Sequence, residues 1–113
     1  MSNATVAAWE AKRTSETCDV ENALRQAGFP QVDAYRYNSA SIRVRVIDPR
    51  FDGLSPEQRD TLVEPHLARL PERTQADIMS LYTFAPSELQ DSQKSLKVRL
   101  MNAEFEDPSP SML

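Results

Sequence analysis

The clearest alternation of hydrophobic and polar positions lies in the stretch SIRVRVI, near the middle of the chain. Its β-branched residues Ile42, Val44 and Val46 alternate with Arg43 and Arg45. A period of two predicts a strand with one buried and one solvated face, and β-branched side chains favour that conformation. The Asp-Pro pair that follows ends the strand, because proline has no N–H to donate to a neighbouring strand.

A capping box predicts a helix that begins after Ser55. This serine is followed by Pro56 at the first helical position and by Gln58 three residues on, the S-x-x-Q form of the box. Hydrophobic residues then recur at helical spacing as far as Leu70. Pro65 interrupts this pattern at a cost of about 3 kcal/mol, because it lacks the N–H and clashes with the preceding turn. We therefore expect either one kinked helix or two short ones.

Two further helices and two further strands complete the expected order. Asp19 caps a helix with hydrophobic residues at helical spacing, and Gly28 suits the positive φ of a helix C-terminus. Runs of hydrophobic and aromatic residues predict strands over 32–37 and 78–84. A second S-x-x-Q box opens an amphipathic helix over 87–103.

The sequence therefore predicts an α+β fold with two layers, in which helices cover one face of a three-stranded sheet. The order is α-β-β-α-β plus a C-terminal helix, with the middle helix kinked or double. The 113 residues fit one domain. We expect a flexible N-terminal arm over 1–17, the domain over 18–103, and an acidic tail over 104–113 with Phe105 and Leu113 as candidate anchors.

The first two strands are expected to form a hairpin with a four-residue turn over 38–41, which pairs Tyr35 with Val44. The face away from the helices then carries three arginines, Arg36, Arg43 and Arg45. Two interpretations stay open. The arginines form a solvated surface that keeps the protein soluble, or they bind a phosphate or an acidic partner, because the planar guanidinium pairs well with oxyanions.

Composition narrows the classes of function. Thirteen basic against seventeen acidic residues give a net charge of −4, which argues against a protein held to nucleic acid mainly by phosphate neutralisation. The single cysteine, Cys18, excludes an internal disulfide and is consistent with a reducing compartment. No stretch resembles a secretory signal or a membrane span. We expect a cytoplasmic protein without membrane contact.

No set of residues predicts catalysis or metal binding. His66 is the only histidine and lies on the hydrophobic side of its helix, which is typical of a structural histidine. Cys18 has no predicted histidine partner, and Asp60 and Glu64, four residues apart, fit a solvated helix face. Glycine-rich phosphate loops are absent. The sequence therefore predicts a protein with no catalytic residues, no metal site and no cofactor.

Two short motifs carry a resemblance to a known family. The sequence RFDG, Arg50 to Gly53, follows the central strand, and SLYTFAPSEL closes the last strand. Residues 20–89 resemble the BolA family of small, KH-like α+β proteins, which have an R-F-x-G turn after a strand and a T-x-T-P-E-W-like end. The family's arginine-histidine-arginine run after that turn is represented here by Arg59 alone.

The resemblance also implies a partner and a cofactor. Members of the family share a [2Fe–2S] cluster with a monothiol glutaredoxin through a histidine that aligns here with Asp77. A carboxylate is a hard oxygen donor and a poor substitute for imidazole on an iron–sulfur cluster. The turn over 38–41 also offers neither cysteine nor histidine. We therefore expect no cluster on this chain.

Two hypotheses of function follow. In the first, the protein is a non-catalytic binding or adaptor protein of BolA-like architecture, in contact with a protein partner of unknown identity. In the second, it is a KH-like nucleic-acid-binding or regulatory protein, although it lacks the GxxG clamp of KH domains. The C-terminal helix either covers the core or forms a homodimer. The candidate binding residues are Arg36, Arg43, Arg45, Arg50 and Arg59.

Overall fold

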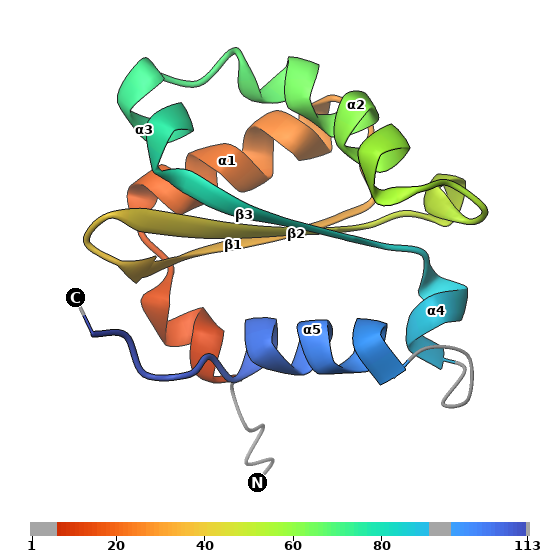
Figure 1. Cartoon of the computed structure of the whole chain (residues 1–113). Coiled ribbons are helices and arrows are strands. Elements are labelled where there is room, and N and C mark those ends of the chain that lie inside the picture. The colour runs from red at the N-terminus through yellow and green to blue at the C-terminus, as the bar shows by residue number, and fades with distance from the viewer. Residues whose placement is uncertain (1–6, 91–95, 113) are drawn as a thin grey trace, which may run out of the picture.

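The computed structural model describes residues 7–90 and 96–112, and within them the chain forms one three-stranded sheet with helices on both faces (Figure 1). The strand order is β1-β2-β3, with β1 antiparallel and β3 parallel to β2. In chain order the elements are η1 (Ala8–Lys12), α1 (Ser15–Gln26), β1 (Gln31–Asn38), β2 (Ser41–Ile47), η2 (Pro49–Phe51), α2 (Pro56–Leu67), α3 (Glu72–Asp77), β3 (Ile78–Phe84), α4 (Pro86–Gln90) and α5 (Leu96–Glu106). The expected α+β class and element order are confirmed.

Local capping explains where the helices begin. The hydroxyl of Ser55 accepts a hydrogen bond from the Gln58 N–H at 3.2 Å, and the Gln58 side chain accepts one from the Ser55 N–H at 2.9 Å. The expected capping box is therefore confirmed. The first helix begins earlier than its expected cap at Asp19, because Thr14 and Thr17 form a reciprocal box of the same kind.

Two helices lie between β2 and β3, but the expected division at Pro65 is not where they separate. Pro65 lies inside the last turn of α2, which ends at Leu67, and α3 follows as a separate helix of six residues. Both helices lie on the same side of the sheet as α1 (Figure 1). The break between the two helices therefore lies after Leu67 and before Glu72.

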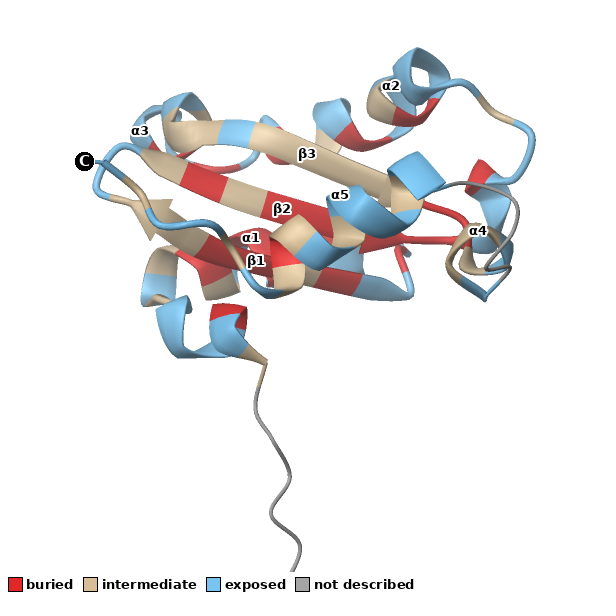
Figure 2. Ribbon diagram, turned by 60° about the horizontal axis from the view of Figure 1, so that its bottom comes forward, coloured by how far each residue is buried: buried red, intermediate tan, exposed pale blue. Residues whose placement is uncertain are grey.

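The face of the sheet that α1 and α2 cover holds the larger hydrophobic core. Its floor is formed by side chains of β1 and β2 that alternate with polar ones, and Leu24 and Val63 pack on it from the two helices. Phe51 from η2 is fully buried among them. Figure 2 shows that burial is greatest along the central strand β2.

The second face of the sheet is covered as well, contrary to the expectation of helices on one face. Helix α5 and η1 lie against it (Figure 1), and Trp9, Tyr35 and Phe105 form a buried aromatic cluster there. The described part of the arm expected over 1–17 is therefore ordered structure. Helix α5 ends at Glu106, three residues beyond its expected end, because Phe105 is a core residue and not part of a tail.

The hairpin register differs from the expected one by one residue. Tyr35 faces Arg43, where Val44 was expected, and the turn contains only Ser39 and Ala40. The side chain of Asn38 closes this turn by accepting a hydrogen bond from the Ala40 N–H at 2.8 Å. An irregularity between residues 36 and 38 then shifts the pairing.

Because successive side chains point to opposite faces, this shift separates the three arginines that the sequence analysis grouped. Arg36 reaches Glu16 of α1, whereas Arg43 and Arg45 reach residues of α5. No arginine triad therefore projects from an open face of the sheet.

The C-terminal segment lies against the hairpin (Figure 2). The Tyr37 hydroxyl donates a hydrogen bond to the Ser109 carbonyl at 2.8 Å, and the Asn38 side chain donates one to the Ser111 hydroxyl at 3.1 Å. The described part of the expected tail is thus attached to the domain. Leu113, the other candidate anchor, and part of the helix expected over 87–103 lie outside the described residues. None of the described helices is long and hydrophobic enough to cross a membrane.

Candidate functional site

Each of the five arginines predicted to bind a partner is paired with a carboxylate of the same chain. Arg36 donates to Glu16 at 3.1 Å and to Asp77, the last residue of α3, at 2.5 Å. Both carboxylates raise the pKa of the Arg36 guanidinium, that of Glu16 most strongly. This cluster connects α1, β1 and α3 on one face of the sheet.

Arg43 and Arg45 lie between the sheet and α5. Arg45 is 4% exposed and donates to Asp33 at 2.7 Å and to Glu106 at 3.0 Å. Its guanidinium carbon is 4.5 Å from the Phe105 ring centroid. Arg43 donates to the Glu104 carboxylate at 2.9 Å. Both guanidinium groups therefore hold α5 on the sheet and have little surface left for a ligand.

Arg50 and Arg59 lie near the start of α2. Arg50 donates to the carboxylate of Asp48 at 2.7 Å. Burial alone would raise the pKa of Asp48, but the hydrogen bonds from Arg50 outweigh burial and lower it. Arg59 is buried and donates to Glu88 at 2.8 Å and to the Thr83 carbonyl at 2.8 Å. The family-like arginine Arg59 thus joins α2, β3 and α4.

The single histidine and the single cysteine have structural surroundings. His66 is half-buried and contacts the ring of Phe29 edge-on, with centroids 5.7 Å apart. The Cys18 thiol is 3.7 Å from the Arg13 guanidinium. Among the described residues no group of three His, Cys, Asp or Glu side chains is placed to hold a metal ion.

The residues at the predicted cluster position do not fit an iron–sulfur cluster. Asp77 lies at the α3–β3 junction, and its carboxylate is occupied by Arg36 at 2.5 Å. The hairpin turn contributes only Ser39 and Ala40, whose side chains are not ligands for iron–sulfur clusters. A carboxylate neutralised by a guanidinium is a poor donor for a metal centre that prefers thiolate and imidazole. That Asp77 replaces the family's histidine stays a prediction.

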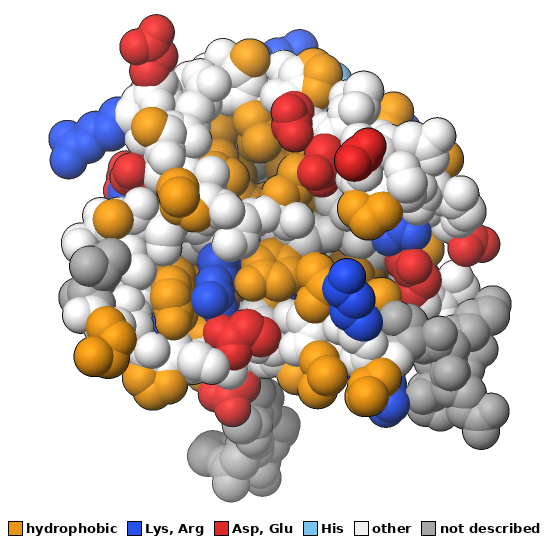
Figure 3. Space-filling view, in the orientation of Figure 1, with side chains coloured by type: hydrophobic (Ala, Val, Ile, Leu, Met, Phe, Trp, Pro, Cys, Tyr) orange, Lys and Arg blue, Asp and Glu red, His pale blue; other side chains and the backbone are white. Residues whose placement is uncertain are grey.

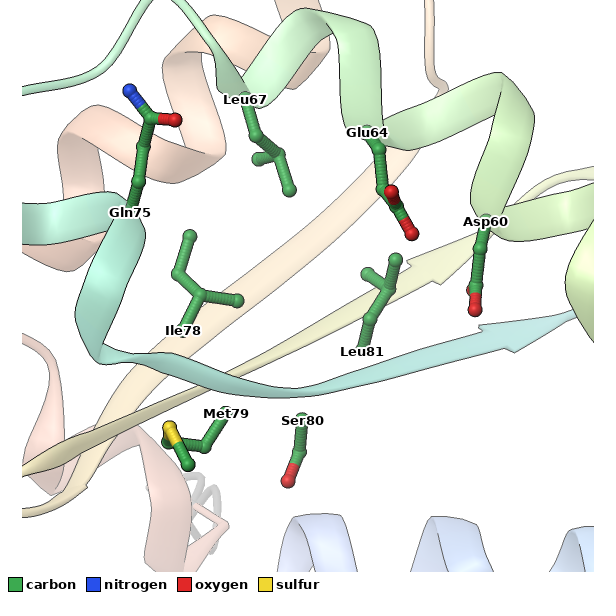
Figure 4. Close-up of a pocket in the computed structure, with 8 residues that line it drawn as sticks. All are labelled: Asp60, Glu64, Leu67, Gln75, Ile78, Met79, Ser80 and Leu81. Atoms are coloured by element: carbon green, nitrogen blue, oxygen red, sulfur yellow. The ribbon is translucent and has the colours of Figure 1, made fainter. Parts of the chain in front are cut away.

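A groove lies between α2, α3 and β3 (Figure 4), and the sequence analysis did not identify it as a site. Its volume is about 410 Å³. Ile78 and Leu81 of β3 point into it toward Leu67, while Asp60 and Glu64 of α2 form one wall. Figure 3 shows this hollow as a hydrophobic floor with acidic side chains beside it. The groove thus combines a hydrophobic surface with negative charge.

The two carboxylates in the wall of this groove have no basic partner among the described residues. Burial is the main cause of a raised pKa at Asp60, and the charges of Glu64 and Glu57 raise it further. The spacing of these acids along α2 was visible in the sequence. Their position beside an edge strand was not, because it depends on the strand order of the sheet.

A second hollow of about 370 Å³ lies farther along β3. Leu81 and Thr83 line it together with residues at the start of α2 and with Lys97 and Met101 of α5. Asp60 and Leu81 border both hollows. The outer edge of β3 is therefore flanked by recessed surface along much of its length.

Comparison with known proteins identifies the fold. No protein-family model matches the sequence, and no curated protein matches it. The fold is similar to the solution structure of the BolA1 protein from Mus musculus, with a TM-score of 0.55 and 22% sequence identity. The match covers 100% of this chain and 86% of that chain. The chain therefore has a BolA-like α+β fold, as the two sequence motifs predicted.

Proposed function

We propose that this protein is a non-catalytic binding or adaptor protein that acts through contact with another protein. The observation that carries the proposal is the outer edge of β3, which two neighbouring hollows border and where Met79 is 68% exposed. Recessed hydrophobic surface beside an edge strand is typical of sites that bind polypeptides. The BolA-like fold supports the same class of function by analogy.

The surroundings of the ionisable groups favour binding over catalysis. A general base needs a substrate-facing position and a partner that orients it. His66 instead packs against Phe29, and Asp48 is held by Arg50. Asp60 and Glu64 line the groove with no cation among its lining residues, and the hydroxyl of Ser80 points away from them (Figure 4).

The surroundings of the candidate arginines argue against nucleic-acid binding through these residues. Binding to phosphates requires guanidinium groups that can exchange counterions for the ligand. The guanidinium groups of Arg43, Arg45 and Arg59 are instead committed to Glu104, Asp33 and Glu88. No specific observation favours the nucleic-acid-binding alternative.

Affinity capture with competition tests the proposed function. The immobilised full chain is exposed to lysate at moderate salt, and an excess of the free folded chain is added as competitor. We expect a protein that is retained, displaced by the folded competitor and retained equally by an Arg50→Gln variant. If no retained protein is displaced by the folded competitor, the adaptor function is wrong.

We further propose a monothiol glutaredoxin as the partner to test first, with contact that does not depend on a cluster. Absorption spectra after reconstitution with iron and sulfide test the role of Asp77. We expect the wild-type mixture to show no more cluster absorption than the glutaredoxin alone, and Asp77→His, but not Asp77→Asn, to increase it. Cluster absorption that requires the wild-type chain would contradict the predicted loss of the ligand.

The homodimer also stays a proposal. Phe105 anchors α5 to the sheet, while Leu96 and Leu100 are 61% and 59% exposed. Sedimentation of the wild type and of a Leu96→Asp/Leu100→Asp variant tests whether these side chains join two chains. A dimer that becomes a folded monomer in the variant supports the interface, and a monomeric wild type excludes it. A reducing compartment such as the cytoplasm also stays a proposal for the location of the protein, and the free thiol of Cys18 supports it.

A further inference from the structure

The two edges of the sheet are protected to different degrees. At the β1 edge, side chains of α1 bind the outward backbone groups. The Glu21 carboxylate accepts a hydrogen bond from the Ala34 N–H at 2.9 Å, and Arg25 donates one to the Val32 carbonyl at 2.8 Å. Glu21 is 1% exposed, so this cover is part of the core. The β1 edge is therefore closed to another strand.

The β3 edge has one such contact within the described residues. Arg59 donates to the Thr83 carbonyl at 2.8 Å, which shows that the backbone groups of Thr83 face outward. Since these groups alternate in direction along a strand, the N–H and C=O of Leu81 face outward too. No described side chain bonds to them. Leu81 therefore presents an unsatisfied donor and acceptor at the free edge.

The length of the open edge is limited at both ends. The pairing of β3 with β2 shifts between Ile78 and Ser80, which leaves Met79 outside the regular ladder. Arg59 occupies the edge at Thr83. Only a short extended segment, centred on Leu81, can add to the sheet here.

The negative charge of the groove indicates which kind of peptide segment would bind there. Asp60 and Glu64 border the groove beside Leu81 (Figure 4), and neither makes an ion pair with a described residue. Burial and the neighbouring carboxylates raise the pKa of Asp60, which is the response of an acid without an ion-pair partner. A bound lysine or arginine would relieve this repulsion. The floor formed by Ile78 and Leu81 suits a hydrophobic side chain next to that cation.

A second copy of this chain is a poorer occupant. Strand β3 contains no charged residue, so it brings no cation to the groove. Two-fold pairing of β3 with its own copy would also bring two sets of Asp60 and Glu64 to one interface. Like charges facing each other across an interface oppose association.

We propose that the outer edge of β3 binds a short extended peptide segment of a partner protein, which pairs with the backbone of Leu81 and places a lysine or arginine beside Asp60 and Glu64. This inference rests on the proposed function, and it names the site and the partner's chemistry. Backbone pairing supplies affinity, while the groove supplies preference for a cation next to a hydrophobic residue.

Titration of the isotope-labelled full chain with two blocked hexapeptides tests the proposal. One peptide alternates valine and lysine, and the other alternates valine and glutamate. We expect the lysine peptide to shift the amide signals of Met79 and Leu81 and to slow hydrogen exchange at the Leu81 amide, because that N–H becomes bonded. Equal binding of the glutamate peptide, or shifts without slowed exchange at Leu81, would overturn the proposal.

A matched pair of charge variants tests the groove itself. Asp60→Asn/Glu64→Gln is expected to weaken binding of the lysine peptide about ten-fold, since close charge pairs contribute on this scale. Glu57→Gln removes a charge from the same helix outside the groove, and it should change the affinity by less than about two-fold because exposed charges are screened. An equal loss of affinity in both variants would show that the lysine peptide responds only to the overall charge of the protein, and it would overturn the site.

The outcomes separate this inference from the proposed function. If a partner is captured equally by Asp60→Asn/Glu64→Gln and the peptide has no effect at Leu81, the proposed β3 site is wrong. The adaptor function would still stand. If no partner is captured but the lysine peptide still binds at Leu81, the adaptor function is wrong and the β3 site stands. A concentration-dependent shift of Leu81 without peptide would replace the partner segment with a second copy.

Discussion

The two faces of the sheet are built from different chemistry. On the face covered by α1 and α2, aliphatic side chains with Phe29 and Phe51 fill the core. On the face covered by α5 and η1, the guanidinium of Arg45 lies beside two rings of the aromatic cluster, 5.8 Å from the Trp9 ring and 4.5 Å from the Phe105 ring. The ion pairs of Arg36 with Glu16 and Asp77 lie outside the hydrophobic core of the first face, whereas on the second face the paired guanidinium of Arg45, 4% exposed, lies against the aromatic cluster itself.

This difference indicates that α5 is the less firmly attached layer. Within α5, Phe105 alone is fully buried, whereas Leu96 and Leu100 are mostly exposed. Arg43 and Arg45 hold the same helix through Glu104 and Glu106. Elements with few buried hydrophobic contacts open locally at lower free energy than the rest of a domain. The aliphatic face should therefore unfold globally, and α5 should open first.

The largest expected effects come from truncating one phenylalanine on each face. Phe51→Ala should lower the free energy of unfolding by about 4 kcal/mol, since it leaves a cavity in the aliphatic core. Phe105→Ala should cost about 3 kcal/mol. Hydrogen exchange separates the two, because Phe51→Ala should accelerate exchange throughout α1 and β2 and Phe105→Ala mainly in α5. Equal acceleration of α1 by both variants would contradict a separable layer.

The same comparison explains which features the sequence could predict. The capping box at Ser55 and the alternation around Val44 act over a few residues, so both were recognised. Trp9 and Phe105 stand isolated in polar stretches, and their contact joins the two ends of the chain. No local pattern predicts such a contact. The second layer was therefore missed, although its two aromatic residues were visible.

The candidate site depended on long-range geometry in the same way. The irregularity near Tyr37 moved Arg36 to the opposite face from Arg43, so the arginine group was predicted from the wrong register. Asp60 and Glu64 were assigned to a solvated helix face. Their groove exists because β3 pairs on one side of β2 and leaves its other edge beside α2.

The next-largest expected effect comes from the ion pairs of Arg45 on the face covered by α5 and η1. Arg45→Met keeps a long hydrophobic side chain between the rings but leaves Asp33, 14% exposed, without its guanidinium partner. We expect urea unfolding to show a loss of about 2 kcal/mol, less than for a fully buried pair because the carboxylates reach solvent. Adding Asp33→Asn to this variant should recover part of the loss. If Arg45→Met alone is neutral, the ion pairs do not hold α5.

A smaller effect concerns the loss of folding stability at low pH. Hydrogen bonds from the Ser109 hydroxyl and N–H lower the pKa of Glu104 below its ordinary value of 4.5, and Arg43 contributes. The resulting stability is present above that value and is lost as the pH falls through the lowered pKa. Glu104→Gln should therefore reduce the acid-induced loss by less than about 1 kcal/mol, because the carboxylate is partly exposed. Glu72→Gln, a change at an exposed position of α3, should leave the pH dependence unchanged in the same urea titrations.

The smallest expected effect is a gain in stability. It concerns Asp60, which lies at the rim of the face covered by α1 and α2 and has no basic partner among the described residues. Burial, Glu64 and Glu57 raise the pKa of Asp60, so ionising it costs more in the folded than in the unfolded chain. Stability from this group is therefore lost as the pH rises from the ordinary value of 3.8 through the raised pKa. Asp60→Asn should stabilise the protein at neutral pH by about 0.3 kcal/mol, as expected for a like-charge pair on a helix. The gain should vanish in acid, where both states of Asp60 are protonated, and a gain that persists there would show that charge is not its cause. An acid that destabilises its own fold at neutral pH, beside an open strand edge, is the expected state of a groove that meets its cation only in a complex.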